Sequence, residues 1–164
     1  MVSTSPGTEA SMEQVIALMV ELRTAIIEAL AARFGPREWQ VAPNVRPFSR
    51  SAADDDRPGA ETVSLGTVYF AGTYPREQWR RAADVVARTG KTFGFDELII
   101  QADGPAGISF AGRHRDGHLY RFGIGATTVL SVRTGAALWA GAPYRNAAQI
   151  PQAGGHNVPS PPRP

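Results

Sequence analysis

The chain has 164 residues, of which 43% are hydrophobic and 20% charged, a composition typical of one globular domain with its own core. It contains no cysteine, which excludes disulfides, thiolate nucleophiles, iron–sulfur clusters and cysteine-ligated zinc. The formal net charge of +2 is too small to predict nucleic-acid binding by itself. Neither a signal peptide nor a transmembrane segment is predicted, because charged residues interrupt the apolar run at 15–30.

The first predicted element is a long helix at 11–34, after a leader at residues 1–10 that we expect to be flexible. Ser11 and Gln14 have the spacing of a capping box, and Gly35 ends the apolar stripe. Further apolar residues widen this stripe: Ile16, Val20 and Ile27. The helix is therefore predicted to be deeply buried or to face a second chain in a homodimer.

Strands and one more helix are expected after it. The weak alternation from Trp39 to Val45 predicts an edge strand or an extended arm, because prolines lie within and beside it. A strand is predicted from Glu61 to Phe70, and a helix that opens at Tyr74-Pro75 and ends at Gly90. Four strand-like runs with short turns between them follow: 97–102, 106–113, 119–124 and 128–134.

These elements predict an α+β fold, a two-layer sandwich in which two helices pack on one face of an antiparallel meander sheet. We expect a single domain at residues 11–142. The segment 143–164 is rich in proline and glycine, which cannot build a core, so a disordered tail is predicted there.

Two of the three histidines flank Asp116-Gly117, and the parity of the strands decides the length of the turn between them. Residues directly opposite each other share a face, so the register must keep the large apolar side chains together. A two-residue turn would place the aromatic residues of the two strands on opposite faces. A three-residue turn at 115–117, with Gly117 left-handed, keeps them on one face. It predicts four pairs: His114 with His118, Gly112 with Tyr120, Phe110 with Phe122, and Ile108 with Ile124.

This register sets the imidazoles of His114 and His118 opposite each other, with Cβ atoms about 5 Å apart. Two imidazoles at that distance can share a metal ion, but a stable site needs a third or fourth ligand. Asp116 is expected at the tip of the turn, pointing elsewhere, and nothing else nearby in the sequence supplies a ligand. Two interpretations stay open: a polar rim without metal, which we favour, and a weak metal-binding or pH-sensing pair. No cofactor is predicted.

The same register defines a second, open face of the sheet, which carries Arg113, Arg121 and Arg133 above a floor of Ser, Ala and Gly. Guanidinium groups bind carboxylates and phosphates through paired donors, so these arginines are candidate ligand-binding residues for an anionic small molecule or protein partner. The alternative is that they are ordinary solvent-facing residues on a one-sided sheet. Nucleic acid is not favoured, because the aromatic residues on which bases would stack fall on the other face.

Several features follow one another in a recognisable order from Glu13 to about Gly141: a helix and then Trp39, the helix with Trp79, Gly94-Phe95, Asp103-Gly104-Pro105, Gly112, Leu119-Tyr120-Arg121-Phe122 and Thr134-Gly135. This order and spacing resemble the LppA-like lipoproteins of actinobacteria. The resemblance implies a small α+β domain tethered to the outer face of the cell membrane, with no established enzymatic activity.

The chain departs from that family in lacking the lipid-bearing cysteine, its signal sequence and two further cysteines. Ala136 stands directly after Thr134-Gly135, where family members often have a cysteine. We therefore expect a soluble, cysteine-free member or a mature fragment. Its location would be the cell envelope if an anchor has been removed, and the cytoplasm otherwise.

The function predicted from these observations is a non-enzymatic binding or interaction domain that uses the arginines of the open face. No acid–base pair or catalytic triad is visible in the sequence. One alternative is a metal-dependent or hydrolytic enzyme centred on His114 and His118. Another is an immunity or adaptor-type module that works through protein–protein contacts.

Overall fold

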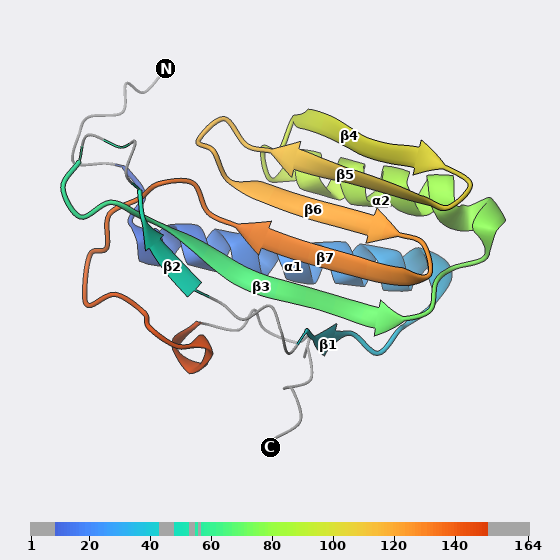
Figure 1. The fold of residues 1–164 in the computed structure, drawn as a ribbon, viewed down its shortest axis with the longest axis horizontal. Helices are drawn as coiled ribbons and strands as arrows, with labels where there is room; N and C mark the ends of the chain where they lie inside the picture. The colour runs from blue at the N-terminus through green and yellow to red at the C-terminus, as the bar shows by residue number, and fades with distance from the viewer. Residues whose placement is uncertain (1–8, 43–47, 53–54, 56, 151–164) are drawn as a thin grey trace.

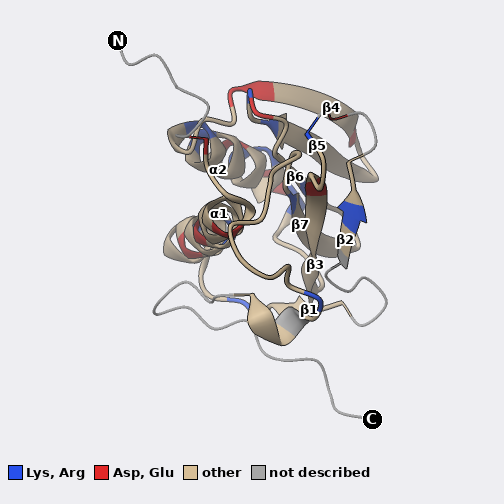
Figure 2. Cartoon of the chain, turned by 90° about the vertical axis from the view of Figure 1, so that its left-hand side faces the viewer, with Lys and Arg blue, Asp and Glu red and all other residues tan. Residues whose placement is uncertain are grey.

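The computed structural model describes residues 9–42, 48–52, 55 and 57–150, and its fold is the predicted α+β sandwich. Two α-helices lie on the same side of a seven-stranded antiparallel sheet (Figures 1 and 2). The elements in chain order are α1 (Met12–Phe34), β1 (Gln40–Val41), β2 (Phe48–Ser51), β3 (Glu61–Ala71), the 3-10 turn η2 (Arg76–Gln78), α2 (Trp79–Thr92), β4 (Glu97–Gly104), β5 (Gly107–Arg113), β6 (Leu119–Ile124), β7 (Thr127–Arg133) and the 3-10 turn η3 (Ala147–Gln149).

The helix α1 begins at the predicted capping box. The Ser11 hydroxyl accepts a hydrogen bond from the Gln14 N–H at 3.2 Å, and the Ser11 N–H donates to the Gln14 side chain at 2.9 Å. The helix ends at Gly35, whose φ of 88° is strained for other residues. The apolar residues that widen the stripe are buried within the chain, because α1 packs against both β7 and α2. Burial within one chain is therefore enough to explain the wide apolar stripe of α1, and a second chain is not needed for it.

The second helix differs from the prediction at both ends. Residues 76–78 form a 3-10 turn, so α2 begins at Trp79 and continues to Thr92. Gly90 therefore lies inside the helix instead of ending it. A Cβ on Gly90 would stand 2.7 Å from the Tyr120 ring, so this glycine allows the helix to approach the sheet.

The four predicted C-terminal strands form the expected meander, in which β4, β5, β6 and β7 are neighbours in order (Figure 1). Next to β7 comes β3, whose outer edge pairs with β1 along one stretch and with β2 along another. The strand β2 was not predicted. Of the proposed arm at 39–45, residues 40 and 41 form the short edge strand β1, while Pro43 and Val45 lie outside the described residues.

The segment 143–150 is packed against the domain, although the sequence placed it in a disordered tail. Arg145 donates hydrogen bonds to the Glu61 carboxylate at 3.2 and 3.3 Å, and Tyr144 packs edge-to-face against Trp139 with ring centroids 5.0 Å apart. Ile150 is 8% exposed and joins the hydrophobic core. The prediction of disorder was based on proline and glycine content, which reflects only local conformational preference. The contacts that hold this segment join residues far apart in the sequence. Residues 151–164 lie outside the described part of the chain.

Alternate residues of the sheet face the helices and form the core with them. The helix-facing side chains of the central strands are almost fully buried: Phe110, Tyr120, Phe122, Ile124, Leu130 and Val132. No α-helix of the described residues covers the opposite face, which we call the open face. Nor does any helix in that part of the chain have the length and apolar character needed to cross a membrane.

Candidate functional site on the open face of the sheet

The β5–β6 hairpin has the predicted three-residue turn. The strand pairs are Gly112 with Tyr120, Phe110 with Phe122 and Ile108 with Ile124. The His114 N–H donates to the His118 carbonyl at 2.9 Å, which closes the turn. Gly117 has a φ of 89°, the left-handed conformation that the prediction required.

The two imidazoles lie side by side, with ring centroids 4.9 Å apart, and each already has a backbone partner. The Nδ1 atom of His118 accepts a hydrogen bond from the Gly135 N–H at 2.9 Å, and that of His114 accepts from the Asp116 N–H at 3.0 Å. A neutral imidazole that accepts through Nδ1 carries its proton on Nε2. Burial lowers the pKa of His118, and the nearby His114 lowers it further, so His118 is held in this neutral form.

A third possible metal ligand stands beside the pair, contrary to the expectation for Asp116. One ligand atom from each of His114, Asp116 and His118 lies within 4.8 Å of the other two. The Asp116 carboxylate is 3.6 Å from the Nδ1 atom of His114. A metal bound through either Nδ1 would have to displace a backbone N–H, and one bound through Nε2 would have to displace its proton. The hydrogen bonds therefore oppose metal binding, although the three side chains converge.

The three predicted arginines lie on the open face in the expected arrangement. Arg113 and Arg133 are opposite Leu119 on its two sides, and Arg121 is opposite Ser131. Arg121 is thus the diagonal neighbour of both other arginines, a relationship that sets Cα atoms about 7–8 Å apart. At this spacing the long side chains of Arg121 and Arg133 can reach the same anionic group.

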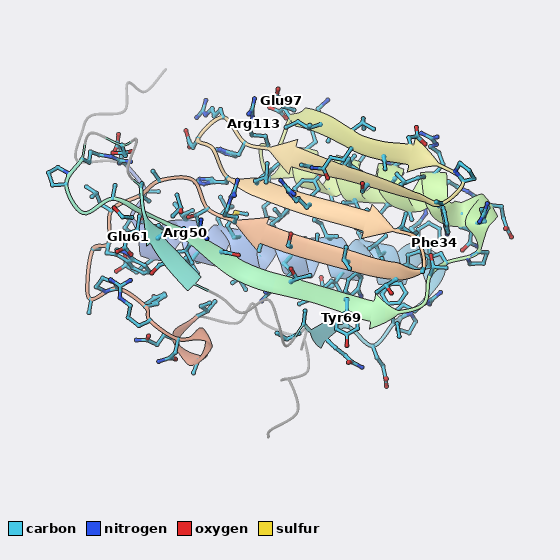
Figure 3. The ribbon with its side chains drawn as sticks, in the orientation of Figure 1. Phe34, Arg50, Glu61, Tyr69, Glu97 and Arg113 are labelled. Carbon is cyan, nitrogen blue, oxygen red and sulfur yellow. The ribbon has the colours of Figure 1, made fainter. Side chains whose placement is uncertain are left out.

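Arg113 has a partner that the sequence analysis missed. Its guanidinium contacts the Glu97 carboxylate of β4 at 2.6 Å, and Figure 3 shows the two side chains together at one end of the strands. For Arg121 and Arg133, both exposed, the described part of the chain offers no hydrogen bond or ion pair. The predicted patch of three cations therefore has two unpaired members and one that is paired.

A β-bulge explains why Glu97 faces Arg113. The β4–β5 register shifts between Ile100 and Ala102, and beyond the shift Glu97 is opposite Arg113. If the register of the Gly104–Gly107 pair continued along the strands without the extra residue, an apolar side chain would lie opposite Arg113 instead of Glu97. Two other members of the open face were also missed: Arg50 on β2, which is already engaged in an interaction, and Tyr69 on β3 (Figure 3).

The floor between the arginines is apolar and nearly closed to water. Ala111 is 2% exposed and Leu119 is 9% exposed, although both lie on the open face. Their strand neighbours are the arginines, whose aliphatic stems can cover apolar surface while the charged heads stay in water. Two residues beyond the Ala111–Arg121 pair, Ser109 and Gly123 lie opposite each other and line a hollow of about 530 Å³. The hollow thus begins about 7 Å from Arg121 along the strand direction.

Three of the residues that carry the family resemblance, Gly94, Phe95 and Gly135, converge around the hairpin turn. The Phe95 ring lies between those of His114 and Tyr120, with centroids 5.3 and 5.6 Å away. A Cβ on Gly94 would stand 2.9 Å from the His114 ring. Gly135 passes so close to the turn that a Cβ there would clash with the backbone of Asp116. These positions therefore share one structural role, which is to pack the turn against the domain.

The fold and the open face of the sheet together define the class of protein. It is a small α+β domain whose antiparallel sheet is covered by α-helices on one side only among the described residues. A family model described as LppA, a lipoprotein confined to pathogenic Mycobacterium, matches residues 3–139, and the chain belongs to this family.

Two crystal structures share the fold. The LppA lipoprotein of Mycobacterium tuberculosis is 17% identical, with a TM-score of 0.62 over 87% of this chain and 86% of that one. A DUF4853 family protein from Actinomyces odontolyticus is 16% identical, with a TM-score of 0.61 over 92% of this chain and 81% of that one. No curated protein matches the sequence.

Proposed function

We propose that this LppA family member is a non-enzymatic binding domain whose open face holds the anionic group of a ligand or protein partner through Arg121 and Arg133. The observation that supports the proposal is the pair of exposed guanidiniums without a partner among the described residues, set diagonally on adjacent strands. Guanidinium forks match the geometry of carboxylates and phosphates. The guanidinium of Arg113 is already paired with the Glu97 carboxylate, so Arg113 is less available to a ligand.

The surface around the two arginines suits a ligand that is larger than a single ion. The floor at Ala111 and Leu119 is apolar, and the hollow beside Ser109 and Gly123 provides space for an uncharged portion. A rigid strand scaffold holds both arginines at fixed spacing, so little conformational order has to be created on binding. We also propose that the protein functions at the cell envelope, because the family is described as lipoproteins.

The alternative function, a metal-dependent or hydrolytic enzyme, is supported by the convergence of His114, Asp116 and His118. It is the second candidate because the Nδ1 atoms of both histidines are engaged with backbone N–H groups. A zinc titration, described in the Discussion, separates the two.

The experiment is a titration followed by the backbone amide NMR signals of the whole chain, with inorganic phosphate and a hexaglutamate peptide as separate probes. We expect shifts in the amides of β6 and β7 on the open face. The double variant Arg121→Gln/Arg133→Gln should bind either probe at least about tenfold more weakly, equivalent to about 1.4 kcal/mol. A preference for one probe would distinguish a phosphate ligand from an acidic peptide.

The matched control is Arg81→Gln/Arg88→Gln, which removes the same charge from exposed positions on α2. If this control weakened binding as much as the open-face variant, the interaction would be a general effect of net charge, and the proposal would be wrong. Shifts confined to residues outside the open face would contradict it as well.

A further inference from the structure

The sheet ends at β4, and this edge strand is exposed along its whole length. Within the described part of the chain, β4 pairs with β5 alone, and all eight residues of β4 are exposed. Three consecutive apolar side chains lie at its centre: Leu98, Ile99 and Ile100, which are 44%, 38% and 61% exposed. Natural edge strands usually carry charges or prolines at such positions, because an open apolar edge pairs with other chains. The centre of β4 has neither.

Both faces of this edge are apolar. Leu98 and Ile100 are opposite Gly112 and Phe110, so they point to the helix side. They stay exposed, while α2 packs mainly over the neighbouring strands β5 and β6. Ile99 is opposite Ala111 and points to the open face. A strand added beside β4 would therefore meet apolar side chains above and below the sheet.

The backbone of the same residues is turned outward. The His114 N–H bonds to β6, and strand hydrogen bonds alternate, so Gly112 and Phe110 also direct their backbone groups to β6. Their partners on β4, Leu98 and Ile100, then direct their N–H and C=O groups away from β5. These groups are available to an added antiparallel strand.

We propose that β4 pairs with β4 of a second copy of the chain, antiparallel and around a twofold axis at Ile99. In this register Ile99 meets Ile99 of the second copy, and Leu98 meets Ile100. Both pairs are apolar, and the outward-facing backbone groups of Leu98 and Ile100 meet each other. The dimer joins the two sheets into one continuous sheet with all helices on the same side.

Charge selects this register over its neighbours. With the axis at Ile99, regular pairing would set the carboxylate of Glu97 opposite the neutral Gln101, which is the bulge residue of β4. Moving the axis to Ile100 would set Glu97 opposite Asp103, and directly opposed like charges destabilise a strand pair. Moving it to Leu98 would set Asp96 opposite an apolar side chain. With the axis at Ile99, β4 is therefore complementary to a second β4, and the two copies make identical contacts across the twofold axis.

The absence of cysteine allows a direct test by single-cysteine cross-linking. Residues on a twofold axis at a non-hydrogen-bonded pair have Cα atoms about 4.5 Å apart, within the range of a disulfide. Ile99→Cys should therefore oxidise to a disulfide-linked dimer. Val129→Cys is the matched control, because Val129 is 37% exposed on the open face and lies away from the edge. The Ile99 variant should cross-link at least about tenfold faster, because association raises the effective thiol concentration.

A second cross-linking experiment tests the register of the proposed strand pair. Mixed Leu98→Cys and Ile100→Cys variants should form the mixed disulfide in preference to either symmetric one, because these residues face each other across the interface. In sedimentation, the unmodified chain should form dimers at high concentration, and Ile100→Lys should stay monomeric. Equal cross-linking rates for the Ile99 and Val129 variants would overturn the proposal, and so would a monomer at every concentration.

Discussion

The ring of Tyr120 fills the space that a side chain on Gly112 would need, because the two residues lie directly opposite each other on β5 and β6. Gly90 of α2 leaves room for the same ring from the helix side. We expect Gly112→Ala to lower the free energy of unfolding by about 1–3 kcal/mol, the usual result of overpacking a filled core. Urea denaturation measures the loss.

Gly104→Ala is the control for that change. Gly104 also lies in a strand, but nothing stands within 4 Å of the position its Cβ would take. Its substitution should change stability by no more than about 0.5 kcal/mol, as is usual at the surface. Equal losses in the two variants would show that the Tyr120 ring does not decide the effect.

Among the described residues, the hydroxyl of Tyr120 has no hydrogen-bond partner, although Tyr120 is 0% exposed. Burial raises the pKa of this phenol, and an unpaired buried hydroxyl costs free energy. Tyr120→Phe should therefore raise the free energy of unfolding by about 1 kcal/mol. In contrast, Tyr69→Phe removes a hydrogen bond to Gln40 at the surface and should lower stability slightly. A destabilised Tyr120→Phe variant would mean that the hydroxyl has a partner.

Strand parity made the hairpin around Gly117 predictable from sequence. Large apolar residues alternate on both sides of this turn, so only one register buries all of them on one face. The positions of Arg121 and Arg133 followed from the same register, because an outward-facing residue is fixed once its neighbours are buried. The family resemblance was confirmed too, and two of its glycines, Gly94 and Gly135, pack against this turn.

Other features depended on contacts that no local pattern encodes. The bulge near Gln101 decides that Glu97 meets Arg113, and nothing in the composition of β4 marks a bulge. Gly90 has the sequence signature of a helix end, and only the approach of Tyr120 explains its place inside α2. All three arginines lie on the open face that the register predicted, whereas the pairing of Arg113 with Glu97 required the structure.

We expect the free energy of unfolding to depend on pH, because the pKa of His118 is lowered in the folded chain. Burial and then His114 lower its pKa from the ordinary 6.5, while Asp116 acts weakly in the opposite direction. Between 6.5 and the lowered pKa, the unfolded chain binds a proton that the folded chain does not, so stability must fall as the pH falls through this window. Denaturation from pH 7.5 to pH 5 should show this loss, with stability nearly constant above pH 7.

His118→Asn is the informative variant for the pH effect. The asparagine oxygen can accept the Gly135 N–H in place of Nδ1, and it does not titrate. The slope of stability with pH should be smaller in this variant. An unchanged slope would assign the pH dependence to other groups.

Zinc tests the competing interpretation of the histidine pair. Because the Gly135 and Asp116 N–H groups occupy the two Nδ1 atoms, we expect zinc to leave the thermal midpoint of the chain unchanged. A metal that bound the folded state at 100 times its dissociation constant would add about 2.7 kcal/mol. A stabilisation of that size that disappears in His114→Ala would establish a metal site and revive the enzyme hypothesis.

Ile150 tests whether the segment 143–150 is part of the domain. Its side chain is 8% exposed and contacts the core, while Arg145 fastens the same segment to Glu61, whose pKa is lowered chiefly by that hydrogen bond. Ile150→Ala should therefore lower the free energy of unfolding by about 2 kcal/mol, the lower end for a buried isoleucine. Leu138→Ala, at a position 38% exposed, should cost less than half as much. Equal small losses would place the end of the domain before this segment.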